Sequence, residues 1–135
     1  MKVRMLTALA VLVSAAVHLR LWLEGYRDIG VVGPAFLVNA VAALVVAVLL
    51  LSRRHWVPGL LAAGFGASTL TAFVVSATVG LFGLHEAWTG GAVLTAGLSE
   101  LVAVAGGVVV CVGEWRRGSG AKSQDRASVA GADLH

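Results

Sequence analysis

Charge is the scarcest property of this 135-residue chain. Only 13% of its residues are Asp, Glu, Lys or Arg, whereas soluble domains carry about 25%. Hydrophobic residues make up 59%, and 17 glycines come in addition. This composition excludes a typical soluble domain, because too few polar side chains are present to cover a surface that faces water. It indicates that lipid is the main solvent of the chain.

Cysteine and the common chemical motifs are also nearly absent. The single Cys111 cannot form an internal disulfide, and no Cys/His spacing typical of zinc sites is present. The sequence has no Walker loop, dinucleotide fingerprint, HExxH or GxSxG motif. The ten Lys and Arg form no stripe with interleaved aromatics, so we expect no nucleic acid partner. We further expect no enzyme, no metal and no cofactor.

Four long apolar runs fill most of the chain. They cover residues 5–23, 31–51, 57–82 and 89–113. Each is near or above the roughly 20 residues with which a helix crosses a hydrocarbon layer of about 30 Å. No run alternates apolar and polar residues as barrel strands do. The sequence therefore predicts an all-α transmembrane four-helix bundle over residues 1–117, followed by a disordered cytoplasmic tail at 118–135.

Basic residues gather on one side of this expected bundle. Eight of them flank the runs on that side: Lys2, Arg4, Arg53, Arg54, Arg116, Arg117, Lys122 and Arg126. The opposite side has only Arg20 and Arg27. Because Lys and Arg are enriched in cytoplasmic loops, we expect both termini in the cytoplasm and a multi-pass protein of the inner membrane. The tryptophans fit two aromatic belts, at the outer ends of runs for Trp22 and Trp88 and at the inner ends for Trp56 and Trp115.

The first run also has features of a signal peptide. Basic residues precede it, and the small residues Ser14 and Ala15 follow its apolar stretch as in a cleavage site. Against this alternative, apolar character continues through Leu19 and Trp22, which makes the run long enough to span. A mature chain that starts at Ala16 would lack the first span, so N-terminal sequencing of the membrane fraction distinguishes the two.

Polar residues within the runs are expected to face the interior of the bundle, because they are costly in lipid. Counting about 1.5 Å per residue from the outer ends places His18, Asn39 and Glu100 within about one helical turn of each other. Hydroxyl groups at helical spacing lie near the same depth. The sequence thus predicts an intramembrane polar cluster of His18, Asn39, Glu100, Arg20, Ser14, Ser68 and Thr71.

Glu100 in this cluster has two interpretations. A carboxylate at the bilayer centre costs about 2.5 to 3.5 kcal/mol on insertion scales, so it needs a reason to be there. It serves either as a proton-accepting or cation-pairing site or as a hydrogen bond that joins two helices. The same alternatives hold for His18 and Asn39. Arg20 either extends toward the membrane surface or reaches toward Glu100.

A second polar set lies at the outer rim. It comprises Glu24, Tyr26, Arg27, Asp28, His85 and Glu86. Mixed charges at a membrane surface are typical of a solvated loop, where exposed ion pairs contribute little. The alternative is an entrance or a metal-capturing mouth above His18, which requires His85 close to His18. Haem bound between two histidines is not expected, because only His18 lies inside a run.

Three features resemble a known class of protein. They are the His-Leu-Arg-Leu-Trp stretch at 18–22, the turn at 32–39 that contains Gly33 and Pro34, and the intramembrane Glu100. In layout the chain is similar to small four-span bacterial membrane proteins of the DoxX-like kind, over about residues 1–117. That resemblance implies an integral membrane protein, often without assigned activity. Small multidrug transporters also depend on a membrane carboxylate, but theirs belongs in the first helix.

From these features we expect an accessory or structural component of the inner membrane. Its partners would be the lipid bilayer and either further copies of the chain, as a homo-oligomer, or a larger membrane complex. The alternative function is a small proton-coupled transporter or a membrane redox module that uses Glu100 and His18.

Overall fold

The computed structural model describes residues 1–80 and 90–132, and these are helical throughout apart from short connections. The elements in chain order are α1 (Lys2–Leu23), the 3-10 turn η1 (Tyr26–Asp28), α2 (Val32–Ser52), α3 (Trp56–Thr78) and α4 (Gly91–Ala132). Each of the four α-helices contains a segment long and apolar enough to cross a membrane. The predicted all-α fold with four membrane-span-like helices is confirmed for the described residues.

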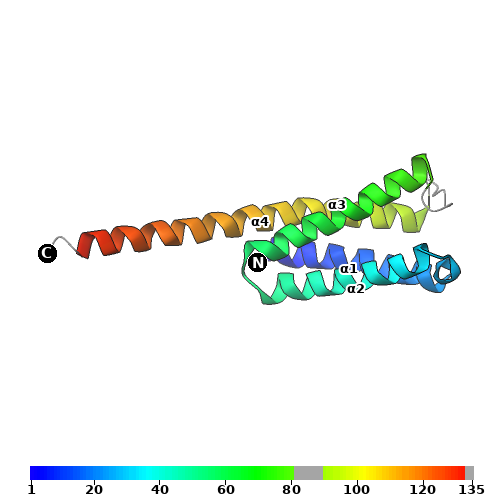
Figure 1. The fold of residues 1–135 in the computed structure, drawn as a ribbon, viewed down its shortest axis with the longest axis horizontal. Helices are drawn as coiled ribbons and strands as arrows, with labels where there is room; N and C mark the ends of the chain where they lie inside the picture. The colour runs from blue at the N-terminus through cyan, green and yellow to red at the C-terminus, as the bar shows by residue number, and fades with distance from the viewer. Residues whose placement is uncertain (81–89, 133–135) are drawn as a thin grey trace.

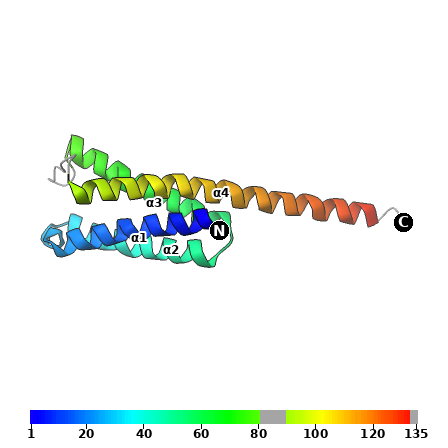
Figure 2. The same cartoon turned by 180° about the vertical axis from the view of Figure 1, so that it is seen from behind.

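The helices form two hairpins that lie side by side (Figure 1). α1 packs against α2 and α4, and α3 packs against α4, whereas α2 and α3 contact each other less. The N-terminus and the α2–α3 loop lie at the end of the bundle from which α4 projects (Figure 2). The basic residues that flank the runs therefore share one end of the bundle.

Local sequence features explain where the helices begin and end. Gly25 has a φ of 131°, which side chains rarely permit, and it turns the chain out of α1. At the start of α3, the His55 ring accepts a hydrogen bond of 3.3 Å from the backbone nitrogen of Val57. Pro58 follows in the first turn, where its missing N–H costs no helical bond. The predicted boundaries of the first two runs agree with α1 and α2 to within a few residues.

Glycines bring the backbones of α3 and α4 into contact. A Cβ added to Gly107 would lie 2.5 Å from the backbone nitrogen of Ala63 and 2.7 Å from the carbonyl oxygen of Gly59. On the neighbouring face of α4, a Cβ on Gly106 would collide with the Thr7 side chain of α1. Helices in lipid associate through such close contacts. Lipid tails are as apolar as the side chains, so van der Waals packing rather than the hydrophobic effect holds the helices together. Small residues accordingly dominate the buried core: Ala8, Val11, Ala43, Val46, Ala47, Leu50, Ala62, Phe65, Ala103 and Val110.

The C-terminal part of the chain differs from the predicted disordered tail. α4 continues through Ala132 and projects beyond the bundle (Figures 1 and 2). Ala, Lys, Gln and Arg in this part are good helix formers, and no proline interrupts them. Extending an existing helix also avoids the cost of nucleation. A segment with few apolar residues can therefore still be helical, and the prediction of a disordered tail was wrong for residues 118–132.

Candidate functional site

Glu100 lies inside the bundle, where α4 faces both α1 and α3. Only 2% of its surface is exposed. Ser14 of α1 donates its hydroxyl to the Glu100 Oε1 over 3.4 Å. Gly66 makes the close approach of α3 feasible, because a Cβ there would lie 2.7 Å from the carbonyl oxygen of Glu100. The carboxyl group thus bonds α4 to α1, and the backbone of the same residue lies against α3.

His18 continues the polar contacts from Ser14 toward the far end of α1. Its Nδ1 lies 2.8 Å from the carbonyl oxygen of Ser14 and 3.4 Å from the Ser14 hydroxyl. A carbonyl oxygen only accepts, so Nδ1 carries the proton in this contact. The His18 ring stands edge-on to Phe36 at a centroid distance of 5.2 Å, and Tyr26 stacks on Phe36 at 5.3 Å. Glu100, Ser14 and His18 therefore form one line of polar groups.

Asn39 is part of the interior but does not complete that line. Its side-chain Nδ2 is buried and has no hydrogen-bond partner among the described residues. An unsatisfied buried donor costs about 1 to 3 kcal/mol. The depth count placed Asn39 level with the other polar groups, yet depth alone does not determine which neighbour an amide reaches.

Three members of the predicted cluster are turned away from it. Arg20 is exposed and forms an ion pair of 2.8 Å with Glu24, one turn further along α1. Ser68 and Thr71 are exposed on α3, where each hydroxyl donates to a carbonyl of its own helix, at 2.8 Å to Phe65 and 2.7 Å to Ala67. The prediction that Ser68 and Thr71 face inward is corrected, and Arg20 takes the outward one of its two predicted directions. A hydroxyl that bonds to its own backbone loses little by facing lipid.

The inward face of α3 instead carries Thr69 and Ser76. Ser76 is buried. Thr69 is half-buried, and its hydroxyl donates to the carbonyl oxygens of Phe65 and Gly66 on its own helix. Thr69 and Ser76 follow the row that begins with Gly59 and Gly66, the glycines in contact with α4. That row has helical spacing in the sequence, but so do the residues around Ser68, so spacing alone does not decide which face of α3 turns inward. The contacts of Gly59 and Gly66 with α4 identify the row that faces inward.

The outer-rim residues form short-range pairs. Glu24 pairs with Arg20, Arg27 pairs with Asp28 at 3.6 Å, and Tyr26 packs on Phe36. His85 and Glu86 lie outside the described residues, as does Trp88. Within residues 1–80 and 90–132, no three His, Cys, Asp or Glu side chains gather as a metal site would require.

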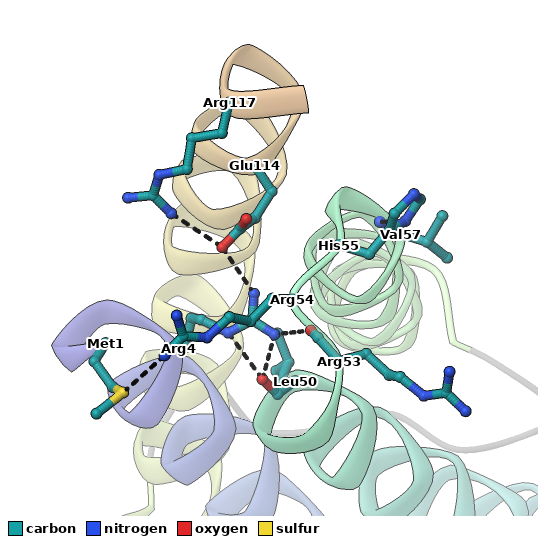
Figure 3. A network of polar contacts seen from close by, with 9 residues as sticks. All are labelled: Met1, Arg4, Leu50, Arg53, Arg54, His55, Val57, Glu114 and Arg117. Carbon is teal, nitrogen blue, oxygen red and sulfur yellow. Dashed lines mark hydrogen bonds and ion pairs between the residues drawn. The ribbon is translucent and has the colours of Figure 1, made fainter. Parts of the chain in front are cut away.

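A second polar network, which the sequence analysis missed, lies at the opposite end of the bundle (Figure 3). Arg4 of α1 donates to the Leu50 carbonyl oxygen at the end of α2, over 2.9 Å from Nε and 2.6 Å from Nη2. Its Nη2 also contacts the Arg53 carbonyl oxygen. Its Nη1 lies 3.1 Å from the Oε1 of Glu114 on α4, and Arg117 lies 3.1 Å from the same oxygen.

This network is sheltered and ties three helices together. The side chains of Arg4 and Glu114 are each only 12% exposed. The last carbonyls of a helix lack partners within it, and a cation there also opposes the negative end of the helix dipole. Arg4 thus caps α2 while it pairs with α4. Only its position at the start of the first run was noted from the sequence.

Comparisons with known proteins add no relative. The chain matches no protein-family model, no curated protein and no solved structure.

Proposed function

We propose that this protein is an accessory or structural component of the inner membrane that associates with a second copy of itself. In this proposal it performs no catalysis and carries no cofactor, and both termini lie in the cytoplasm. The four apolar helices support the membrane setting, and the basic end of the bundle supports the orientation. The resemblance to DoxX-like proteins in layout is part of the same proposal.

One observation carries the proposal of self-association. Gly64, Ser68 and Ala72 lie four residues apart on α3, and all three are exposed. A Cβ on Gly64 would meet no atom of residues 1–80 or 90–132 within 4 Å. Such small residues at intervals of four are the pattern through which membrane helices approach each other closely. The inward glycine row of α3 is already occupied by α4, so the outward row is available to another helix.

A second copy of the chain fits this row. The row carries no charge, and the Ser68 hydroxyl is already bonded to its own helix. Two identical rows can meet about a two-fold axis, so that each helix offers the other the same small surface. α3 also contacts α2 only lightly, which leaves the outward side of α3 accessible.

The experiment measures energy transfer between donor- and acceptor-labelled copies in lipid vesicles. A variant with both Gly64→Leu and Ser68→Leu should weaken association at least about tenfold, equivalent to about 1.4 kcal/mol. Ala105→Leu is the matched control, because Ala105 is a small exposed residue on α4. Energy transfer equally strong in the double variant would contradict the proposal. Loss in the control variant as well would contradict the assignment to α3.

Co-purification in mild detergent tests the alternative partner. Suppose that the wild type retains a different membrane protein and the double variant loses it, while labelled copies show no energy transfer. In that case the accessory function holds but self-association is wrong. An absorption spectrum of the purified protein tests the cofactor-free part, since a haem or flavin band would contradict it.

The line from Glu100 through Ser14 to His18 favours one second candidate, a small proton-coupled transporter or membrane redox module. A buried carboxyl group with a hydroxyl and an imidazole beside it is an arrangement that proton relays use. Glu100→Gln keeps the shape and the hydrogen bonding but cannot exchange a proton. Loss of proton flux in proteoliposomes with normal folding would favour this candidate, whereas unchanged flux and growth would favour the structural one.

A further inference from the structure

A cavity opens beside the Arg4 network, at the basic end of the bundle. Its volume is about 490 Å³, within the range of roughly 300 to 1,000 Å³ that is usual for small-molecule sites. The first turns of α1, the end of α2 and the part of α4 around Glu114 form its walls. It is separate from the Glu100 cluster, which lies deeper in the bundle.

Positive charge dominates the wall of this cavity. Arg4, Arg54 and Arg117 line it, against the single carboxylate of Glu114. Glu114 already accepts from both Arg4 and Arg117 through one oxygen. Three guanidinium groups against one carboxylate give the wall a net charge of two positive units. The cavity therefore suits an anion.

The guanidinium groups of Arg54 and Arg117 also have free donors. Arg54 donates to the Met1 sulfur over 3.6 Å, and a thioether is a weak acceptor. Arg117 uses one nitrogen for Glu114. Figure 3 shows the Arg54 side chain crossing that of Arg4 toward Met1, and Arg117 next to Glu114. A guanidinium group binds phosphate oxygens in pairs, so these two side chains offer a phosphate group its most favourable ligands.

The rest of the wall is apolar and continues onto the surface that faces lipid. Met5, Leu51 and Val109 line the cavity, and each is more than half exposed. Trp56 and Trp115 pack together at the same end with a centroid distance of 5.6 Å, and tryptophan marks the headgroup level of a membrane. The cavity therefore lies where a lipid phosphate lies, with an apolar path for the acyl chain.

We propose that this cavity binds the phosphate of an anionic phospholipid, with Arg54 and Arg117 as its ligands. Arg4 is a positioning residue, because its own donors are used by Leu50 and Glu114 and it holds α1, α2 and α4 around the cavity. Basic pockets between membrane helices are known to bind anionic headgroups. The inference does not depend on self-association through α3, so each can fail without the other.

The test uses the full chain in mild detergent at 0.15 M salt, where diffuse attraction to exposed charges is screened. Native mass spectrometry counts the lipids retained from added phosphatidylglycerol or phosphatidylcholine. The wild type should retain one phosphatidylglycerol and discriminate against phosphatidylcholine. The variant with Arg54→Gln and Arg117→Gln should bind phosphatidylglycerol about thirtyfold more weakly, a change of about 2 kcal/mol.

The matched control removes the neighbouring charges. Arg53→Gln with Arg116→Gln lowers the net charge equally, and neither side chain lines the cavity. Its phosphatidylglycerol binding should stay within about twofold of wild type. Equal weakening in the control, or equal retention of the two lipids by wild type, would overturn the proposal. Replacing Arg54 and Arg117 with Lys keeps the charge but not the paired hydrogen bonds, so binding should fall between that of the wild type and that of the Gln variant, which separates loss of the site from loss of folding.

Inorganic phosphate and glycerol 1-phosphate form the second arm. Displacement of phosphatidylglycerol only at high concentrations of these ions supports a lipid as the occupant, because the apolar wall then contributes. If either ion binds at the same residues and phosphatidylglycerol does not, a soluble phosphate compound is the ligand and the lipid proposal is overturned.

Discussion

Replacing Gly107 with alanine tests the contact between α3 and α4. The added Cβ would lie 2.5 Å from the Ala63 nitrogen and 2.7 Å from the Gly59 oxygen, whereas ordinary contacts measure 3.4 to 4 Å. Both neighbours are backbone atoms, so α3 must move away by about 1 Å. Overpacking of this kind costs about 1 to 3 kcal/mol, and the better helix propensity of alanine returns up to about 1 kcal/mol. We expect a net loss of about 1 to 2 kcal/mol.

The same helix supplies the control. A Cβ added to Gly97 would meet no described atom within 4 Å, so Gly97→Ala should leave the free energy of unfolding unchanged or raise it. Unfolding in mixed micelles is followed by circular dichroism, and the fluorescence of the Trp56–Trp115 pair reports α3–α4 contact. Equal stability of the two variants would refute the close approach of these helices.

Three further changes are measured in the same unfolding assay. Arg4→Gln should lower the free energy of unfolding by roughly 1 to 3 kcal/mol, because it leaves the sheltered Glu114 carboxylate half-paired; an effect no larger than that of Arg53→Gln would argue against the network. Asn39→Leu should be neutral or stabilising, since it removes a buried donor to which the described part of the chain offers no partner, and a large loss of stability would show that the amide has one. Ser14→Ala should cost about 0.6 kcal/mol, the usual size of a hydrogen bond between membrane helices, and a cost above about 2 kcal/mol would mean that Ser14 does more than bond to Glu100.

The spans could be predicted from the sequence because lipid imposes a length and an apolar composition on any helix that crosses it. The inward position of Glu100 followed from the same physics, since a carboxyl group is far more costly in lipid than a hydroxyl. Ser68 and Thr71 were misplaced for the converse reason. Their hydroxyls are satisfied by their own helix, so burial was not required.

The Arg4 network could not be predicted from spacing. Arg4 meets Leu50 and Glu114 across 46 and 110 residues of sequence, and nothing in the local pattern of an N-terminal arginine distinguishes a capping role from a flanking charge. Its partners depend on which helices become neighbours. That order follows from the glycine contacts of α3 with α4 and from the packing of α1 between α2 and α4.

The most direct test of the account is where the ends of the chain lie relative to a membrane. Tags at the N-terminus and the C-terminus are probed with protease in sealed vesicles after the membrane fraction is pelleted without detergent. Four spans predict a chain that pellets with the membrane and has both tags on the same side. A chain found in the supernatant, or tags on opposite sides, would contradict the four-span architecture.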